Sequence, residues 1–86
     1  MSGLVTTLTR WTVYGRRSAD VRGKPLTAGV HAEKLDSLDA AMLFLTSEMV
    51  RGGRVDAVIV QLDIGIDDPH MRRVVHRVGE GRAWWE

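Results

Sequence analysis

The sequence contains no cysteine. This excludes a disulfide framework, a zinc-thiolate site and a thiol nucleophile, so a fold this small must be stabilised by packing or by association. No stretch approaches the roughly 18 apolar residues of a membrane-spanning helix. The start, MSGLVTTLTR, lacks the charged and apolar regions of a secretory signal. We therefore expect a cytoplasmic protein without a membrane segment.

Motifs of catalysis are missing as well. The chain has no GxSxG, no Walker loop and no GxGxxG. Its histidines, His31, His70 and His76, follow neither the HExxH pattern nor the spacing of an EF-hand loop. Residues 31–33 and 67–70 could supply metal ligands, but structural or solvent-facing histidines and turn-forming aspartates explain both stretches. The sequence therefore predicts no enzyme activity, no cofactor and no metal site.

What the chain does contain is typical of one small globular domain over residues 1–86. Hydrophobic residues make up 44% of the sequence and charged residues 27%, which is too apolar for a disordered chain. A domain of this length buries well under three quarters of its unfolded surface, so a partner subunit would add stability. The net charge of +1 is unevenly spread, because both ends are basic and the middle is acidic.

Two strands are expected in the first part of the chain. Residues 4–14 are rich in β-branched and aromatic side chains at period two, which predicts a long strand. Residues 15–25 combine glycine, proline and basic side chains, a pattern typical of an exposed loop. Residues 26–32 alternate in character and predict a second, shorter strand.

One helix and two further strands are expected in the rest. In the segment DSLDAAMLFLTSEMVRGG, Asp36 or Ser37 can cap the first amides, and Gly52 with Gly53 can end the helix. The apolar run VDAVIVQLDI predicts an interior strand, and MRRVVHRV predicts a strand with one exposed face. This order predicts an α+β two-layer sandwich, ββαββ, with a mainly antiparallel sheet and one helix on one face.

The predicted helix has more apolar residues than one covering sheet needs. Its main stripe has the spacing i, i+3, i+4, i+7, i+11. The stripe consists of Leu38, Ala41, Met42, Leu45 and Met49. Leu43 and Phe44 lie outside it. We expect these two side chains to contact a second covering surface, which another copy of the chain would supply.

Two adjacent tryptophans, Trp84 and Trp85, follow the last predicted strand. Burying one tryptophan contributes about 4 to 6 kcal/mol before entropy is subtracted, so at least one of them is expected to dock. Neighbouring residues of a strand point to opposite faces. The other indole is then expected to face outward, where tryptophan often anchors a protein contact. The alternative is that both close the edge of the core.

Basic residues support a second interpretation. Arg73 and Arg77 would line one face of the last strand, and four more basic residues would crowd the loop between the first two strands. These four are Arg16, Arg17, Arg22 and Lys24. With Trp11 or Tyr14 nearby, such a surface could hold phosphates and stack a base. The alternatives are a GC-rich coding bias and charges that keep an edge strand soluble, and a net charge of +1 is below the usual basic footprint.

The excess of arginine over lysine, the alanine and valine content and the absent cysteine resemble the small accessory proteins of GC-rich bacteria and their phages. The resemblance lies in composition and size, and no motif carries it. It implies binding to another protein, sometimes a host protein. The sequence thus predicts a non-enzymatic, self-associating protein-interaction module, a homodimer, with Trp84, Trp85, Phe44 and Leu43 as contact residues. Nucleic-acid binding through the basic loop is the alternative.

Overall fold

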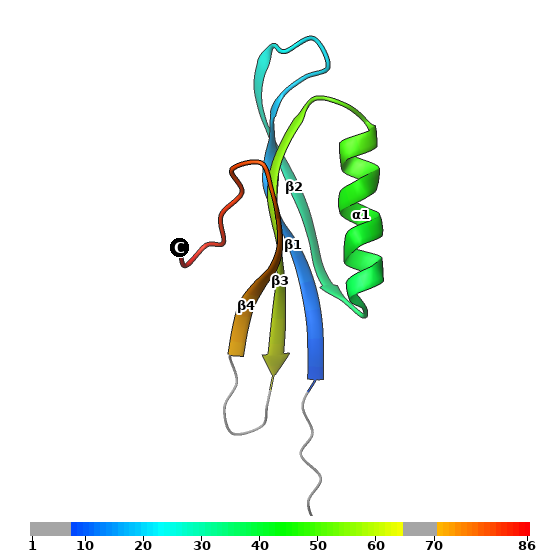
Figure 1. Ribbon diagram of the computed structural model, residues 1–86, viewed down its shortest axis with the longest axis vertical. Helices are drawn as coiled ribbons and strands as arrows, with labels where there is room; N and C mark the ends of the chain where they lie inside the picture. Colours follow the sequence, from blue (N-terminus) through cyan, green and yellow to red (C-terminus); the bar gives the residue numbers. More distant parts are fainter. Residues whose placement is uncertain (1–7, 65–70) are drawn as a thin grey trace, which may run out of the picture.

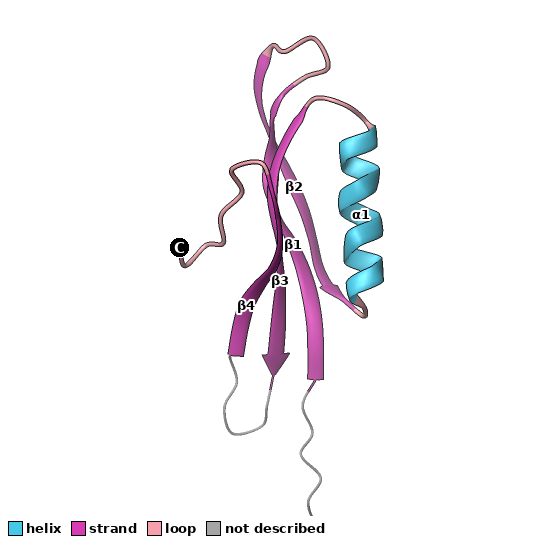
Figure 2. Ribbon diagram, in the orientation of Figure 1, coloured by secondary structure: helices cyan, strands magenta, loops and turns pink. Residues whose placement is uncertain are grey.

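The computed structural model describes residues 8–64 and 71–86. They form a four-stranded antiparallel sheet with one helix packed on one face (Figures 1 and 2). The elements are β1 (Leu8–Ala19), β2 (Pro25–Leu35), α1 (Leu38–Val50), β3 (Arg54–Ile64) and β4 (Met71–Val78). The predicted α+β sandwich of order ββαββ is therefore confirmed.

The strand order is β2-β1-β3-β4, so the central pair is β1 with β3. Because β1 lies between β2 and β3, the connection through α1 crosses over β1, and the helix contacts all three strands. This crossover covers one face of the sheet and leaves β2 and β4 as its edges.

The first strand extends further along the chain than the sequence predicts. Residues 15–19 belong to β1 and not to an exposed loop. They stay in the sheet because β1 has a partner on both sides; Arg16, for example, lies opposite Gly29 of β2 and Asp56 of β3. The predicted strand residues 4–7 lie outside the described residues.

The second strand is also longer than predicted, since it continues to Leu35. Its register with β1 is unbroken from Ala28 to Ala32 and shifts on either side of this stretch. At the later shift Lys34 has a φ of 57°, a left-handed conformation that accompanies β-bulges. β2 is therefore regular only in its middle.

The helix begins and ends as the sequence predicts. Ser37 is its N-cap and accepts a hydrogen bond from the Ala40 amide at 3.0 Å. Gly52 and Gly53, with φ of 94° and 86°, follow its last turn. Those left-handed angles are the reason why glycine suits this end of the helix.

The core lies between α1 and the sheet. Ala41 and Leu45 of the helix pack against Val13, Val30 and Ile59, and all five side chains are almost fully buried. The outer members of the predicted stripe, Leu38 and Met49, remain partly exposed. The helix therefore buries a narrower stripe than the spacing predicts.

The alternation predicted for β3 is confirmed, whereas that of β4 is interrupted. Ile59 packs in the core under α1, and Val58 packs in a second cluster on the opposite face. The register between β3 and β4 shifts after Ile59. As a result Val78 packs on the helix side and Val74 on the opposite side, although their even spacing predicts one face.

Candidate interaction surface on the face opposite the helix

The C-terminal residues 79–86, here called the tail, fold back over the face of the sheet opposite α1 (Figure 1). A turn at Gly79, with a φ of 57°, follows β4, as the glycines of this segment predict. Beyond the turn, Ala83 is buried in a cluster with Val58 and Val60. The sequence leaves this face to polar residues or a partner. In the structure the chain covers part of it with its own tail.

The tail approaches β3 closely because Gly81 has no side chain. A β-carbon at Gly81 would overlap the backbone of Ala57. A β-carbon at Gly15 of β1 would overlap the same residue. Both positions therefore require glycine for the close approach of two backbones.

An arginine holds the end of the tail. The guanidinium of Arg77 donates two hydrogen bonds to the Glu86 carboxylate, at 2.9 and 2.8 Å, and another to the Gly81 carbonyl. The Ala83 amide also donates to Glu86, at 2.8 Å. The Arg77 hydrogen bonds, helped by this amide, lower the pKa of Glu86 to about 2. Glu86 is therefore charged, and bonded to β4, at neutral pH.

A buried carboxylate holds the turn before the tail. Asp56 of β3 accepts hydrogen bonds from the Glu80 amide and the Ser18 hydroxyl, both at 2.8 Å, and from Arg54 at 3.3 Å. The Glu80 amide, then the Ser18 hydroxyl, hold the pKa of Asp56 below its ordinary value against the opposing effect of burial. Asp56 thus links β1, β3 and the tail through one charged group.

Aromatic rings form a series across this face. Tyr14 of β1 meets His31 of β2 edge to face at a centroid distance of 6.1 Å, and Trp84 of the tail at 5.7 Å. Trp84 meets Trp85 at 5.0 Å, and Arg72 of β4 lies 4.7 Å above the Trp85 ring. Such edge-to-face and cation-π contacts hold the rings in defined positions. Tyr14 is still 38% exposed and Trp84 47% exposed.

A hollow of about 900 Å³ opens beside these rings, between the tail and β1. Tyr14, Arg16 and Arg82 contribute to its lining together with Asp56, Glu80 and Glu86. The three carboxylates are already bonded to Arg54 or Arg77. Within residues 8–64 and 71–86, neither Arg16 nor Arg82 forms an ion pair. The hollow therefore offers two unpaired guanidinium groups beside an exposed aromatic ring.

The two tryptophans have different environments. Trp85 is half-buried and packs against the cluster of Val58, Val60 and Ala83, whereas Trp84 is the more exposed ring. One docked and one outward indole is the arrangement that the sequence predicts. The reason differs, because the tail forms turns and not a strand.

The predicted helix contacts are also divided. Phe44 is half-buried and packs against the core under α1, so it is mainly a structural residue. Leu43 is 69% exposed, and Val50, two turns further on, is 80% exposed. The apolar outer side of the helix thus consists of Leu43 and Val50.

The predicted basic loop is not assembled. Arg22 and Lys24 lie in the turn between β1 and β2, but Arg16 and Arg17 are strand residues. On β4, Arg77 lies opposite Val58 and Arg73 opposite Gln61. Val58 and Gln61 are three positions apart, so Arg73 and Arg77 point to opposite faces and not to one. The error has one cause: β1 continues through the arginines.

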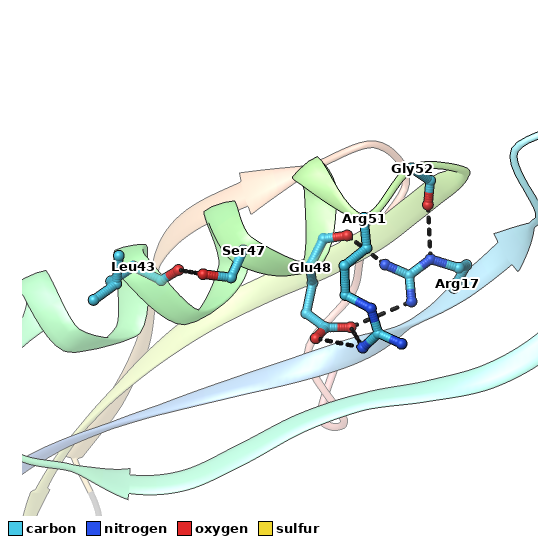
Figure 3. Close-up of polar contacts among 6 residues, drawn as sticks. All are labelled: Arg17, Leu43, Ser47, Glu48, Arg51 and Gly52. Atoms are coloured by element: carbon cyan, nitrogen blue, oxygen red, sulfur yellow. Dashed lines mark hydrogen bonds and ion pairs between the residues drawn. The ribbon is translucent and has the colours of Figure 1, made fainter.

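Arg17 has a structural role on the helix side (Figure 3). It donates to the Gly52 carbonyl at 2.9 Å, to the Glu48 carboxylate at 3.2 Å and to the Glu48 carbonyl. Arg51 bonds the same carboxylate at 3.1 Å, and the Ser47 hydroxyl bonds the Leu43 carbonyl at 2.8 Å. Arg17 thus satisfies carbonyls at the end of α1 and is not free to bind phosphate.

Arg82 and Arg72 have roles on this face that the sequence interpretation misses. Arg82 lies beside the hollow and Arg72 lies over Trp85. Their sequence signal is weak, because only the fold-back of the tail brings Arg82 near β1. For Arg82, its place two residues before Trp84 is the one available sign.

No group of three metal-ligating side chains comes together in the described part of the chain. His31 lies 3.2 Å from Glu33, and residues 67–70, the other stretch considered for ligands, lie outside the described residues. Among the residues that the structure describes, no helix is long and apolar enough to cross a membrane.

Comparison of the chain with models of protein families, with curated proteins and with solved structures gives no match. The argument for function is therefore based on the geometry of this surface alone.

Proposed function

We propose that this chain is a small, non-enzymatic protein-interaction module that self-associates and binds a partner or host protein with the face opposite α1. The observation that supports this most directly is Trp84. Its ring lies between Tyr14 and Trp85 and is 47% exposed. A tryptophan already ordered before binding loses little conformational entropy on binding. Such residues are the usual centres of protein interfaces.

The hollow beside Trp84 defines what the partner would present. Arg16 and Arg82 favour a carboxylate there, because a guanidinium binds carboxylates with two parallel hydrogen bonds. Tyr14 and Trp84 favour an apolar or aromatic side chain next to it. The proposed contact is therefore an acidic residue adjacent to an apolar one, and the proposed compartment is the cytoplasm.

The test compares wild type with Trp84→Ala in capture from extract of the native cell, read by quantitative mass spectrometry. Proteins enriched by wild type are expected to fall at least tenfold with Trp84→Ala and with Arg16→Glu. Arg22→Ala, which changes an exposed arginine away from the hollow, is the matched control and should retain them. An unchanged set of captured proteins with Trp84→Ala would contradict the proposal.

Nucleic-acid binding is the second candidate, and one observation favours it. Tyr14 and Trp84 are exposed rings next to Arg16 and Arg82, a combination that suits a single strand whose bases stack and whose phosphates are neutralised. It predicts that an oligothymidylate quenches tryptophan fluorescence in a salt-dependent way. Replacement of Arg16 and Arg82 should abolish the quenching, and replacement of Arg22 and Lys24 should not. No quenching at low salt would remove this candidate.

A further inference from the structure

The two edges of the sheet are protected very differently. β4 carries Arg72, Arg73 and Arg77, has a register shift in its middle and lies next to the tail. Charged side chains and bulges are the devices by which proteins keep an edge strand from pairing with another chain. The β4 edge is therefore blocked.

The edge formed by β2 has no such protection in its middle. Residues 28–32 read Ala-Gly-Val-His-Ala and contain no acidic or basic side chain other than His31. Over this stretch the register with β1 is unbroken, so the backbone is regular, and its outer side has no strand partner in the described part of the chain. Ala28, Gly29 and His31 are exposed. A regular, uncharged edge is a template for a further strand.

We propose that β2 pairs with β2 of a second copy of this chain, antiparallel, about a two-fold axis at Val30. The two sheets then form one continuous sheet of eight strands. The inference rests on the self-association proposed above and names the surface that carries it. Pairing of identical edges satisfies the backbone groups of both copies at once and closes after two subunits.

The side chains of β2 favour this register. An axis at Val30 places Gly29 opposite His31 of the second copy, and a β-carbon at Gly29 would have no atom within 4 Å. The open space therefore accommodates the incoming imidazole. The same register, extended outward, brings Lys24 toward Asp36 of the second copy.

Neighbouring registers are less favourable. An axis one position earlier, at Gly29, would bring Lys24 toward Lys34 of the second copy. An axis one position later would place the two His31 rings opposite each other. Like charges opposite each other destabilise paired strands, so electrostatics selects the axis at Val30.

The faces of the two subunits are compatible with this pairing. A two-fold axis perpendicular to the sheet keeps both helices on one face and both tails on the other. Trp84 and the hollow lie opposite α1 and remain open in each subunit. Self-association through β2 and partner binding at Trp84 are therefore independent.

Engineered cysteines test the register without background, because the chain has none of its own. Ala28 would lie opposite Ala32 of the second copy, at the 4.5 to 5.5 Å Cα separation, roughly, that a disulfide spans. Two Ala28 positions would lie about 13 Å apart along the strands. Under mild oxidation, a mixture of Ala28→Cys and Ala32→Cys should form disulfide-linked dimers, while each variant alone should not. Circular dichroism checks that each variant is folded.

A charge at the edge gives a second test. Gly29→Lys has room in the isolated subunit, but it would place two lysines diagonally across the proposed pairing and next to His31. We expect its dissociation constant for self-association, measured by analytical ultracentrifugation, to rise at least tenfold. Thr46→Lys, on the exposed side of α1, is the matched control and should leave the constant unchanged.

The outcomes separate this inference from the rest of the proposed function. A dimer that survives Gly29→Lys, or that does not crosslink in the mixture, overturns the β2 pairing and leaves self-association intact. A wild-type monomer at millimolar concentration overturns both, while capture of a partner through Trp84 is unaffected. Crosslinking in the mixture alone, together with dissociation by Gly29→Lys, supports the pairing.

Discussion

The two faces of the sheet are covered by different means. On one face, α1 buries aliphatic side chains such as Leu45 against Val13 and Ile59. On the other, the tail is held by a smaller apolar cluster, by the Arg77–Glu86 pair and by edge-to-face rings that stay partly exposed. The comparison teaches that the helix face supplies stability, whereas the tail face has exposed aromatic and charged groups available for binding. Substitutions on the two faces should therefore have separable effects.

The largest expected effect is on the helix face. Leu45→Ala removes a fully buried side chain from the core. It should lower the free energy of unfolding by about 3 kcal/mol through lost burial and the remaining cavity. Urea denaturation followed by circular dichroism measures the change. Leu43→Ala, on the exposed side of the same helix, is the matched control and should change stability by less than about 0.5 kcal/mol. Equal losses in the two variants would contradict this packing.

A smaller loss is expected from the tail face. Trp85→Ala should lower the free energy of unfolding by about 2 kcal/mol, because Trp85 is half-buried and loses only part of a full tryptophan transfer. The same change should expose the tail to proteolysis at Arg82 while α1 stays protected. Limited trypsin digestion with mass spectrometry distinguishes these sites. Protection of Arg82 equal to wild type would show that Trp85 does not hold the tail.

The dependence of stability on pH should come mainly from the tail face. Asp56 and Glu86 have folded-state pKa values below their ordinary ones, that of Glu86 at about 2. As pH falls, the unfolded chain takes up these protons first, so the stabilisation is complete above pH 5 and is lost as pH falls from about 4 to 2. Asp56→Asn should lower stability at pH 7 by about 1 to 2 kcal/mol. It should also flatten the acid decline. Denaturation curves from pH 2 to 7 test this, and an unaltered slope in Asp56→Asn would exclude Asp56 as a contributor.

The smallest effect on stability is expected at the proposed binding residue. Trp84→Ala removes an exposed ring and should change the free energy of unfolding by less than about 0.5 kcal/mol. A loss comparable to that of Trp85→Ala would mean that Trp84 holds the fold and does not serve binding. Chemical denaturation of both variants side by side makes this distinction.

The elements of the fold could be predicted from local patterns because their signals are local. Ser37 and Gly52 mark the ends of α1, and the alternation of β3 marks its two faces. The extent of β1 could not be predicted, since the segment GRRSA is polar and joins the sheet only because strands flank it on both sides. Tertiary pairing overrides local propensity at such positions.

The candidate site was predictable only in part. An outward tryptophan follows from its adhesive side chain and its neighbour, but its setting depends on the fold-back of the tail. The hollow brings Arg16 and Arg82 together from positions far apart in the sequence. No spacing rule links residues whose proximity arises from long-range packing. The interruption of β4 likewise depends on its register with β3 and left no mark in its own alternation.

The contact between Gly81 and Ala57 means that a single methyl group could act as a wedge. Alanine at position 81 would push the last residues off β3 without altering any charge. That form of the molecule would keep its helix and its four strands but lose the alignment of its indoles. The difference between a closed and an unlatched state of this protein is thus one carbon atom wide.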